Sequence, residues 1–428
     1  MSEAPIQSAL RIGLAGLGTV GSAVAIALRD GRIPGAELRR VVVRDLSKTR
    51  SINLDGVDLD TNPLSLVEAD DIDVVVELMG GTDDPALNLV VQALQAGKPV
   101  VTANKAMLSA HAQKLTELSE RFGQPLAYEA AVAGGIPIIK TLRESLAGNR
   151  VTRVSGILNG TCNYILTQMA DTGDAFEAIL EKAQALGYAE ADPEFDVEGI
   201  DAAQKLSLLA SLAFGVTPNI ELVEYSGISS ILPRDIRAAK EFGCQIRLIA
   251  VAEEKAEGVS LWVGPALLRN GHPLSTIRGV TNAVVISADP VGELMLQGPG
   301  AGGGATASAV LGDIADIVGG FGRMFGGDER RSARQVMNTG RVGQCEWYLR
   351  LMLKDTSGSM AHVTNVLAQH DVSIGEIIQR APSDGESHLP VVFITHDCSE
   401  SVMRAALEQV TALEHVSETV LCLPVFNA

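Results

Sequence analysis

Cysteine is scarce in this sequence, and the few cysteines follow no pattern. The five of them (Cys162, Cys244, Cys345, Cys398 and Cys422) are odd in number and lie far apart along the chain. No CxxC pair and no Cys/His ligand spacing occurs, which argues against a disulfide framework and against a zinc site. Free thiols at scattered positions suit a reducing compartment, so we expect the protein to be cytoplasmic.

Basic residues are also few, because 34 Lys and Arg face 52 Asp and Glu, for a formal net charge of −18. Such a balance repels phosphate backbones and anionic lipid, so we expect neither nucleic acid nor a membrane surface as a partner. The N-terminus lacks a basic-then-apolar signal pattern. The longest uncharged run, Leu294 to Gly312, is glycine-rich and contains Pro299, which is a loop composition and not a membrane span.

Apolar residues, in contrast, make up 46% of the 428 residues, which is enough for two or three domains. Strand and helix signals alternate over about the first 130 residues. We expect strands at Leu10–Ala15, Leu38–Val43, Ile72–Met79, Pro99–Thr102 and Leu126–Glu129, and helices at Val20–Arg29, between Pro85 and Gly97, and at Ala106–Phe122. Repeated βα units predict an α/β fold with a doubly wound parallel sheet of the Rossmann type.

The rest of the chain has two further patterns. From about Ile138 to Leu296 the signals are mixed α+β, with a clear helix at Gly199–Phe214, and a further helix is expected at Thr306–Val318. A basic stretch, Asp328–Arg334, precedes the tail. There we expect Trp347–Leu353 (strand), Met360–His370 (helix), Ser373–Arg380 (strand), a turn at Ser383–Gly385, Leu389–Thr395 (strand), Ser401–Val410 (helix) and Val416–Leu423 (strand). This βαββαβ order predicts a ferredoxin-like sandwich.

A glycine loop connects the first strand to the first helix. It reads Gly16-Leu-Gly18-Thr19-Val20-Gly21. Such a turn lets backbone amides and a helix N-terminus approach a dinucleotide pyrophosphate. The alternative is a tight βα turn without a ligand, but the strand–turn–helix context favours cofactor binding.

Charged residues follow the second expected strand. An NAD enzyme usually places an acid there for the ribose 2′-hydroxyl, whereas this chain has Arg44 first, then Asp45, with Lys48 and Arg50 close by. A cationic strand end suits a 2′-phosphate, so NADP is modestly preferred over NAD. The alternative is a solvated charge cluster with no role in cofactor choice.

The segment Ala189–Lys205 contains six carboxylates and one cation. Asp201 and Lys205 are four residues apart on one expected helix and therefore share a face. Leucines that follow near this stripe put the lysine at the margin of an apolar surface, where desolvation favours its neutral form and a carboxylate opposes that effect. The spacing alone leaves two interpretations open: a structural ion pair beside a solvated acidic loop, or a polar pocket with a proton-transferring lysine.

Several motifs together resemble homoserine dehydrogenase. The family signature is met by Ala183, Gly187, Asp192-Pro193, Asp196, Gly199, Asp201 and Lys205, and supporting matches are Thr102-Ala-Asn-Lys105, Gly160-Thr161-Cys-Asn-Tyr164, Glu129–Gly135 and Gly300–Gly303. The resemblance covers nearly the whole chain, and the tail resembles an ACT amino-acid-binding domain. It implies the NAD(P)-dependent interconversion of L-aspartate 4-semialdehyde and L-homoserine in threonine, methionine and isoleucine biosynthesis.

The resemblance also implies roles for single residues. Lys205, with Asp201, would exchange the hydroxyl proton of homoserine, and Lys105 would lie near the nicotinamide as a second cation. The expected substrate-binding residues are Glu190, Asp196, Thr161 and Gly160; the expected cofactor-binding residues are Gly16, Gly18, Thr19, Val20, Gly21, Arg44, Thr82, Thr102, Lys105 and Gly302. Glu129, with the carbonyls of Val132, Gly134 and Ile136, resembles the family's monovalent cation site, which suits sodium.

From these expectations follows a domain organisation. Residues 1–137 form an NAD(P)-binding Rossmann domain completed by about 297–330, residues 138–296 a catalytic and dimerisation domain, 331–346 a linker and 347–428 an ACT domain. ACT domains pair across subunits and bind amino acids, so we expect a homodimer or homotetramer and threonine as effector. We also expect the tail to be separable. Ser357 stands where ACT domains often have proline, which leaves a purely assembling tail open.

Two other functions stay open at this point: a related amino-acid dehydrogenase, and a non-catalytic amino-acid sensor. Intact Lys105, Asp201 and Lys205 argue against the sensor. The first strand and its glycine loop lie within the first 21 residues, so we expect no kinase domain fused ahead of them.

Overall fold

The computed structural model describes residues 9–50, 52–323, 325, 336, 342–380, 388–417 and 419–427. The chain forms two compact units that do not follow chain order. The first comprises Met1–Val154, Gln204–Glu221 and Asn282–Arg334, and the second Ser155–Ala203, Leu222–Thr281 and Gln335–Ala428. The basic stretch 328–334 and the turn 383–385 expected from the sequence lie outside the described residues.

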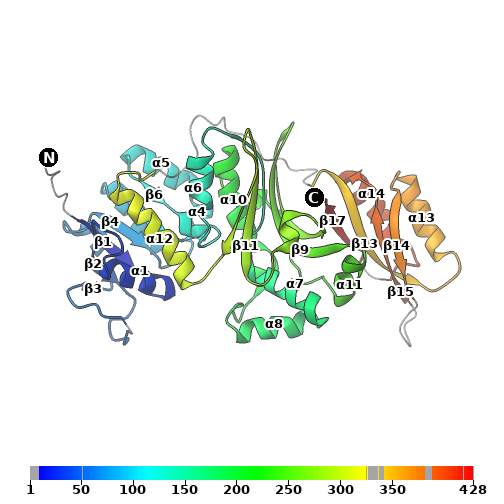
Figure 1. Ribbon diagram of the computed structural model, residues 1–428, viewed down its shortest axis with the longest axis horizontal. Helices are drawn as coiled ribbons and strands as arrows, with labels where there is room; N and C mark the ends of the chain where they lie inside the picture. Colours follow the sequence, from blue (N-terminus) through cyan, green and yellow to red (C-terminus); the bar gives the residue numbers. More distant parts are fainter. Residues whose placement is uncertain are drawn as a thin grey trace. The chain divides into compact units, whose positions relative to one another are not determined.

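A six-stranded parallel sheet forms the first unit (Figure 1, blue to cyan). Its strands are β1 (Leu10–Ala15), β2 (Ala36–Val42), β3 (Asp58–Asp60), β4 (Val74–Glu77), β5 (Val100–Thr102) and β6 (Leu126–Ala127), in the order β3-β2-β1-β4-β5-β6. The chain reverses its direction of travel across the sheet between β1 and β4, both of which pair in parallel with their neighbours. The doubly wound sheet is confirmed, and ligands of such sheets bind at this reversal, outside the carboxyl ends of the strands.

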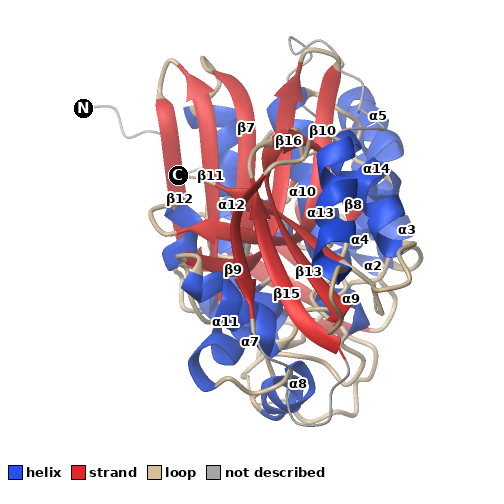
Figure 2. Cartoon of the chain, turned by 90° about the vertical axis from the view of Figure 1, so that its right-hand side faces the viewer, coloured by secondary structure: helices blue, strands red, loops and turns tan. Residues whose placement is uncertain are grey.

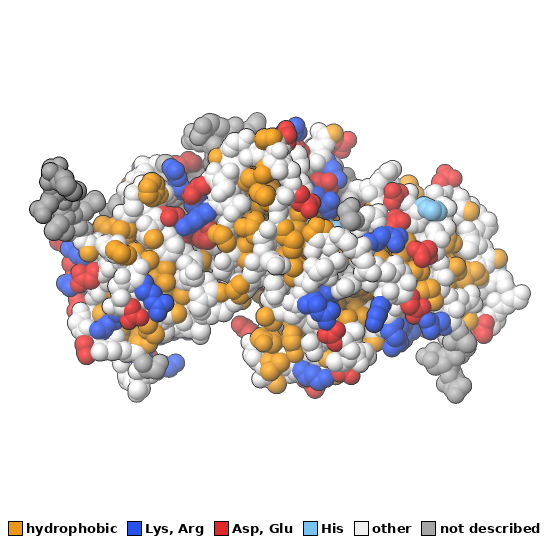
Figure 3. All heavy atoms as spheres, viewed as in Figure 1, with side chains coloured by type: hydrophobic (Ala, Val, Ile, Leu, Met, Phe, Trp, Pro, Cys, Tyr) orange, Lys and Arg blue, Asp and Glu red, His pale blue; other side chains and the backbone are white. Residues whose placement is uncertain are grey.

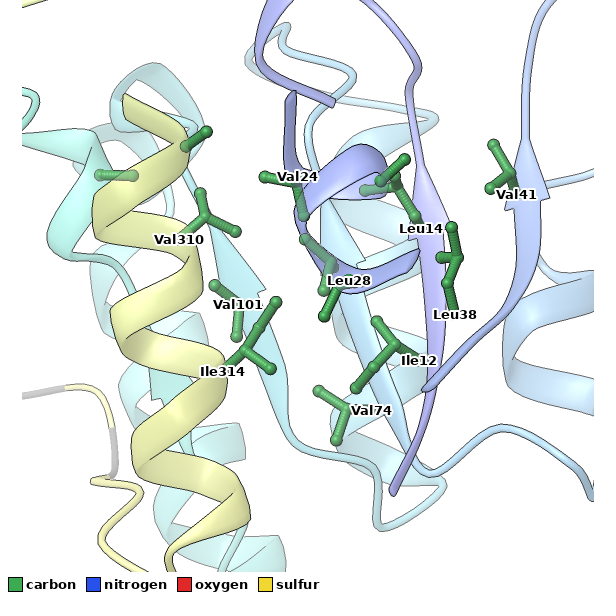
Figure 4. Packing of buried hydrophobic residues seen from close by; sticks show 14 of the residues in the cluster. Ile12, Leu14, Val24, Leu28, Leu38, Val41, Val74, Val101, Val310 and Ile314 are labelled. Carbon is green, nitrogen blue, oxygen red and sulfur yellow. The ribbon is translucent and has the colours of Figure 1, made fainter. Parts of the chain in front are cut away.

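Helices of the first unit cover this sheet and include one that returns from far along the chain. They are α1 (Thr19–Arg29), α2 (Ser65–Glu68), α3 (Ala86–Gln95), α4 (Lys105–Ala110), α5 (Ala112–Phe122) and α12 (Gly303–Val318). Val310 and Ile314 of α12 join the apolar cluster of β1 and α1, where Leu14, Val24 and their neighbours are buried (Figure 4). The region after residue 297 therefore completes the core of this unit.

The helix expected over 106–122 is in fact two helices. His111 separates α4 from α5 because its backbone departs from the helical conformation (φ −119°) and its ring Nε2 lies 2.9 Å from the Asp83 carboxylate.

Beyond β6 the chain continues through several short elements. These are the 3-10 helix η1 (Glu129–Ala131), α6 (Ile138–Lys140), the π-helix η2 (Thr141–Ser145) and β7 (Arg150–Ile157). The first unit also receives the 3-10 helix η3 (Ile220–Leu222) in part, and β11 (Thr281–Asp289) and β12 (Gly292–Pro299). Helix α10 (Ile200–Phe214) crosses between the units after Ala203.

The second unit combines helices with a mostly antiparallel sheet. Its elements are α7 (Gly160–Thr172), α8 (Phe176–Ala185), α9 (Glu194–Val197), β8 (Glu224–Tyr225), α11 (Pro233–Glu241), β9 (Cys244–Lys255), β10 (Gly258–Arg269), η4 (Pro273–Thr276), β13 (Gln344–Lys354), α13 (Ser359–Gln369), β14 (Ile374–Gln379), β15 (His388–Thr395), β16 (Cys398–Ser399), α14 (Glu400–Thr411) and β17 (Leu421–Phe426). The strand order β9-β10-β17-β13-β15-β14 runs without a break from the middle of the chain into its tail. Figure 2 labels β9, β10, β13 and β15 of this sheet.

The tail has the predicted βαββαβ order. Leu349 and Leu351 of β13 pack on one face with Val363 of α13 and Met403 of α14. Successive residues of a strand point to opposite faces, so the even-numbered residues of β13 face away from these helices. There Tyr348 donates a hydrogen bond to Asp235 of α11.

The separable tail stays a prediction, and the contacts of the tail with the preceding segment argue against it. Strand β17 pairs in parallel with β10 (Leu267 opposite Val425), so the tail's sheet is continuous with that of the preceding segment. The carboxylate of Asp235 is fully buried, and both Tyr348 and Arg350 of the tail reach it. The described part of the tail therefore belongs to the second unit.

The surface shows no strong segregation of charge on the face drawn in Figure 3, where Lys and Arg side chains lie among Asp and Glu. None of the helices in the described ranges combines the length and apolar character that crossing a bilayer requires.

Candidate active site

The glycine loop between β1 and α1 is shaped by three different requirements. Gly16 has φ +98°, and a Cβ placed on it would lie 2.5 Å from the carbonyl oxygen of Leu78. A Cβ on Gly21 would lie 2.1 Å from the carbonyl oxygen of Gly16. A Cβ on Gly18, in contrast, would meet no atom within 4 Å. Gly16 and Gly21 are thus required for the turn itself, whereas Gly18 borders open space at the start of α1.

Two helix N-termini meet beside this loop. Gly18 is the N-cap of α1 and Gly302 (φ +111°) the N-cap of α12, and neither helix start is capped by a side chain. A Cβ on Gly303 would lie 2.7 Å from Cγ2 of Thr19, so the two helix starts are in contact. Uncapped amides and the aligned helix dipoles favour an anion here, as the pyrophosphate of a dinucleotide would supply.

A buried acid organises the loops at the carboxyl ends of β4 and β5. Glu77 is fully buried, and its Oε1 accepts hydrogen bonds from the amides of Met79 (2.7 Å) and Gly80 (3.1 Å). Its Oε2 accepts one from the Thr102 hydroxyl (2.6 Å). The hydroxyl of Thr102, which we expected at the cofactor, is therefore hydrogen-bonded to Glu77. The sequence signal for Glu77, an acid at the end of a buried strand, was overlooked.

Lys105 is the first residue of α4, and the preceding residue, Asn104, fixes this helix start by two hydrogen bonds. The N-cap Asn104 accepts a hydrogen bond from the Met107 amide at its Oδ1 (3.2 Å) and donates one from Nδ2 to the Gly81 carbonyl (2.7 Å). This amide joins the start of α4 to the loop that carries the exposed Thr82. Both expected site residues thus lie at the carboxyl edge of the parallel sheet.

Arg44 lies exposed just after β2, at the same edge of the sheet. The neighbouring Asp45 carboxylate accepts hydrogen bonds from the Ser47 amide (2.8 Å) and hydroxyl (2.6 Å), which hold the pKa of Asp45 below its usual value. Arg50 donates to the backbone oxygen of Asp45. Asp45 is therefore engaged within its own turn, and Arg44 is the side chain at the end of β2 that extends toward solvent.

In the candidate cation site, the carboxylate of Glu129 also caps a helix. Glu129 is buried, and its carboxylate accepts hydrogen bonds from the amides of Ile139 (2.8 Å) and Lys140 (2.9 Å). The carboxylate thereby caps the N-terminus of α6. Burial raises the pKa of Glu129. Gly134 has φ +55°, and the Ile136 carbonyl accepts a hydrogen bond from Ile138 (2.7 Å).

A second buried carboxyl group, that of Asp313, lies next to Glu129. Asp313 of α12 accepts the Glu129 amide (2.9 Å), and burial raises the pKa of Asp313 to about 7. Lys140 balances this pair, because its Nζ lies 2.7 Å from Asp316 and 3.9 Å from Asp313. Within the described residues no group of three or more His, Cys, Asp or Glu side chains is placed to hold a metal ion.

The acidic segment, in the second unit, is organised by a residue that sequence reasoning missed. The Nδ2 of Asn159 donates to Asp196 Oδ1 (2.8 Å) and to Asp201 Oδ2 (2.9 Å). Its Oδ1 accepts the Cys162 amide (2.8 Å) and so caps α7. One side chain thus joins three segments of the chain and holds two carboxylates close together. The signal was its place directly before Gly160, at the start of an expected substrate motif.

The other expected substrate residues have different surroundings. Thr161, buried at the start of α7 after Gly160, donates to the Tyr188 carbonyl (2.7 Å), and its hydroxyl lies 3.3 Å from Asp196 Oδ2. Glu190 is exposed, and its backbone oxygen accepts a hydrogen bond from Gln184 (2.9 Å). The structure therefore brings Thr161, Asp196 and Asp201 together around Asn159 and leaves the Glu190 carboxylate at the surface.

Helix α10 carries two buried charged residues one turn apart. Asp201 is 5% and Lys205 9% exposed, which is unusual for charged side chains. Lower on the helix, the hydroxyl of Ser207 lies 3.2 Å from that of Ser109, which ties α10 to the helix that begins at Lys105. Both lysines are thus placed by buried, well-fixed helices.

Comparison with known proteins gives consistent matches along the chain. Residues 137–315 match the family model described as homoserine dehydrogenase, residues 16–129 match its NAD-binding domain, and residues 347–415 match the ACT domain. Homoserine dehydrogenase of Synechocystis sp. is 41% identical, with 96% of this chain and 98% of that protein covered. The Neisseria gonorrhoeae homoserine dehydrogenase is 39% identical over 96% of this chain and 97% of its own.

Solved structures agree. The homoserine dehydrogenase from Thiobacillus denitrificans superimposes with a TM-score of 0.90 at 37% identity and covers 98% of this chain and 99% of its own. A hyperthermophilic archaeal homoserine dehydrogenase mutant in complex with NADPH has a TM-score of 0.61 at 31% identity, and covers 73% of this chain and 98% of its own.

Proposed function

The chain belongs to the homoserine dehydrogenase family. We propose that Lys205 carries the proton transfer of its reaction and that Asp196 and Asp201, which Asn159 holds, bind the substrate. The chain is an NAD(P)-dependent oxidoreductase that interconverts L-aspartate 4-semialdehyde and L-homoserine in amino-acid biosynthesis. The observation that carries the proposal is the single amide that fixes Asp196 and Asp201 at the start of the lysine-bearing helix.

The substrate is a zwitterion whose ammonium needs anionic partners. Asp196 and Asp201 supply them, because charge-assisted hydrogen bonds to carboxylates are strong and the neutral Asn159 amide lets two such carboxylates coexist without neutralising either. Thr161 offers a hydroxyl beside Asp196. Glu190, at the surface, would approach the ammonium through water or after movement of its loop.

Proton transfer is assigned to the lysines. Lys205 takes the hydroxyl proton of homoserine as the alcohol is oxidised and returns it in the reverse direction, and Asp201 one turn earlier stabilises its charged form. Lys105 orients the reacting oxygen as a second cation. The nicotinamide, when bound, supplies the hydride acceptor or donor at C4. Mixing the protein with L-homoserine and NADP should raise the absorbance at 340 nm, and an absence of homoserine-dependent reduction would refute the function.

NADP is the cofactor we propose in preference to NAD, held by the glycine loop, the start of α12 and Arg44. Arg44→Ala should weaken NADP binding by about 1.5–3 kcal/mol, the usual contribution of one hydrogen bond to a charged group, and leave NAD binding unchanged. Dissociation constants from fluorescence titration of the reduced cofactors measure this. Arg32→Ala, an exposed arginine paired with Asp30, is the matched control. Equal losses for both cofactors would mean that Arg44 supports only the fold.

Three further assignments complete the proposal. A monovalent cation, sodium being the best match, would bind Glu129 and the carbonyls of Val132, Gly134 and Ile136, with a structural role. The protein would assemble as a homodimer or homotetramer. An amino-acid effector, with threonine as the first candidate, would act through the ACT domain.

A further inference from the structure

A small cavity lies inside the second unit, at the end of α7 that is remote from Asn159. It has a volume of about 250 Å³ and is bordered by α7, α11 and β9, which contact one another. Asp171, on its wall, follows Asn159 by 12 residues, which is about 18 Å along a helix, so the cavity is separate from the candidate active site. The polar residues that line it are Asp171, Lys240, Gln245, Arg247, Asn270 and Arg278.

A buried arginine forms part of the cavity wall. Arg247 is 1% exposed, and its hydrogen-bond partners among the described residues are all neutral. Its Nε donates to the Ile277 carbonyl (3.1 Å) and its Nη1 to the Ile246 carbonyl (2.9 Å), while Nη2 donates to the side-chain oxygen of Gln245 (2.6 Å). Burial lowers the pKa of Arg247 to about 10, so the side chain is still charged at neutral pH. Because a buried charge without an opposite charge is costly, an anion in the cavity would stabilise this arrangement.

The other charges around the cavity do not cancel that of Arg247. Asp171 is the one acidic side chain among the described lining residues, and Nη2 of Arg278 contacts both of its oxygens (2.5 and 2.6 Å). Lys240 is exposed near the end of α11 and has no ion-pair partner in the described part of the chain. Helices α7 and α11 both end at the cavity, and each C-terminus contributes about half a negative charge. The lining therefore keeps about one net positive charge.

Two side-chain amides add hydrogen-bond donors to this charge. The oxygen of the Gln245 amide accepts from Arg247, whereas its NH₂ group and the side chain of the exposed Asn270 have no hydrogen-bond partner within the described ranges. Donors thus come from α11, from β9 and from the turn after β10. Donors from several directions suit a phosphate, which has at least three acceptor oxygens, better than a planar carboxylate with two. The cavity is smaller than most sites for drug-sized ligands, so the ligand must be small.

We propose that this cavity binds a phosphate group, either as free phosphate or as the end of a small phosphomonoester. The ammonium of Lys240 and the amides of Gln245 and Asn270 bind its oxygens, and the buried charge of Arg247 attracts it to the cavity wall. None of these side chains belongs to the proposed catalytic machinery, so the proposal does not depend on the proposed function.

Calorimetric titration of the full-length protein with inorganic phosphate and with glycerol 3-phosphate measures binding and distinguishes the two sources of the group. Lys240→Gln removes the ammonium. Arg237→Gln is the matched control, because Arg237 is exposed on the same helix, does not line the cavity and changes the net charge equally. We expect at least one probe to bind the wild type and Arg237→Gln, and to bind Lys240→Gln at least about fivefold more weakly.

A second variant blocks the cavity without removing a charge. Ala170→Phe adds a large side chain at an exposed lining position of α7, and thermal melting verifies its fold. It should lose probe binding while remaining folded. Acetate, titrated in the same way, should bind the wild type more weakly than phosphate does.

Three results would overturn the proposal. The first is binding of neither phosphate probe to the wild type at millimolar concentration. The second is equal binding by Lys240→Gln and Arg237→Gln, which would place the phosphate elsewhere on the protein. The third is acetate binding as tight as that of phosphate, which would mean that the cavity does not select a phosphate group.

Discussion

At the scale of single residues, the main finding is that one neutral amide organises the acidic segment. Asn159 uses both amide functions: its oxygen caps α7, and its nitrogen binds Asp196 and Asp201. The capping function could be replaced by other residues, but the contact with two carboxylates requires an NH₂ group. In the proposed mechanism Asn159 is a positioning residue, which would act on the substrate through the two carboxylates.

This assignment predicts a selective effect for Asn159→Ser. Serine is a good N-cap, so α7 should remain stable, but the donors to both carboxylates are lost. We expect the melting temperature to stay close to that of the wild type and kcat/KM for homoserine to fall by about tenfold or more. The acidic limb of its pH profile should move to higher pH, because the two carboxylates lose the hydrogen bonds that favour their charged forms.

Asn163→Ser is the matched control for this experiment. It lies on the same helix and is equally buried, but its amide donates to the Gly279 carbonyl (2.9 Å) and not to a carboxylate. It should change stability without moving the pH profile. If both variants show the same profile, the special role of Asn159 is wrong.

The sequence revealed the roles of some residues and not of others. The spacing of Asp201 and Lys205 could be read because one helix fixes it. Asn159 could not be found by spacing, since its partners lie 37 and 42 residues away and meet only in the fold. Glu77 was missed for the same reason, because its partner Thr102 lies on the next strand of the sheet.

At the scale of elements, the start of α1 combines a tight turn with open space. The loop brings three backbone segments close together at Gly16 and Gly21, and leaves space at Gly18. The start of α12 adds a second uncapped helix terminus to the same place. The two helices together offer more unsatisfied amides than α1 could alone.

A clean test of the cofactor site follows from the space at Gly18. Gly18→Ala introduces a Cβ that meets no protein atom within 4 Å, at an ordinary φ of −79°, so the fold should be unaffected. The same Cβ would occupy space needed by a pyrophosphate, and we expect the dissociation constant for NADPH to rise by about tenfold or more.

The control is Gly148→Ala, since Gly148 also has no neighbour within 4 Å of a Cβ and lies in the loop before β7. It should leave NADPH binding unchanged. Tight NADPH binding by Gly18→Ala would show that the cofactor does not lie over this turn.

Elements with strong local signals were predicted well, and those set by distant pairing were not. The glycine loop, α1 and the parallel strands followed from periodicity and turn residues. Strand β3 has only three residues, two of them acidic, and gave no apolar pattern. Strand β17 begins at Leu421, five residues later than expected, because its register is set by pairing with β13 and β10, which lie far away in sequence.

At the scale of the whole molecule, the tail is part of the second unit. Strand β17 lies between β10 and β13, and Trp262 packs edge-on against Phe426 (6.2 Å between ring centroids). The βαββαβ order could be predicted from the tail alone. The pairing of its strands with the preceding sheet could not be predicted, because neither segment contains a sequence signal that specifies the partner strand.

Truncation before Gln344 should therefore destabilise what remains. It removes Tyr348 and Arg350 from the buried Asp235 and leaves a long edge at β10. Breaking a buried ion pair typically costs about 3–5 kcal/mol, so we expect a lower melting temperature and aggregation of the truncated protein. Asp235→Asn in the truncated chain should recover part of the loss. A truncated protein as stable as the full chain would contradict the integral tail.

The most direct test of the account is the turnover of Lys205→Ala with L-homoserine and NADP. We expect kcat to fall at least about 10²-fold, the usual scale of general acid–base catalysis, while the dissociation constant for NADPH stays the same. Lys182→Ala, an exposed lysine paired with Asp174, should behave like the wild type. Near-normal kcat in Lys205→Ala would contradict the account and move the proton transfer to Lys105 or to water.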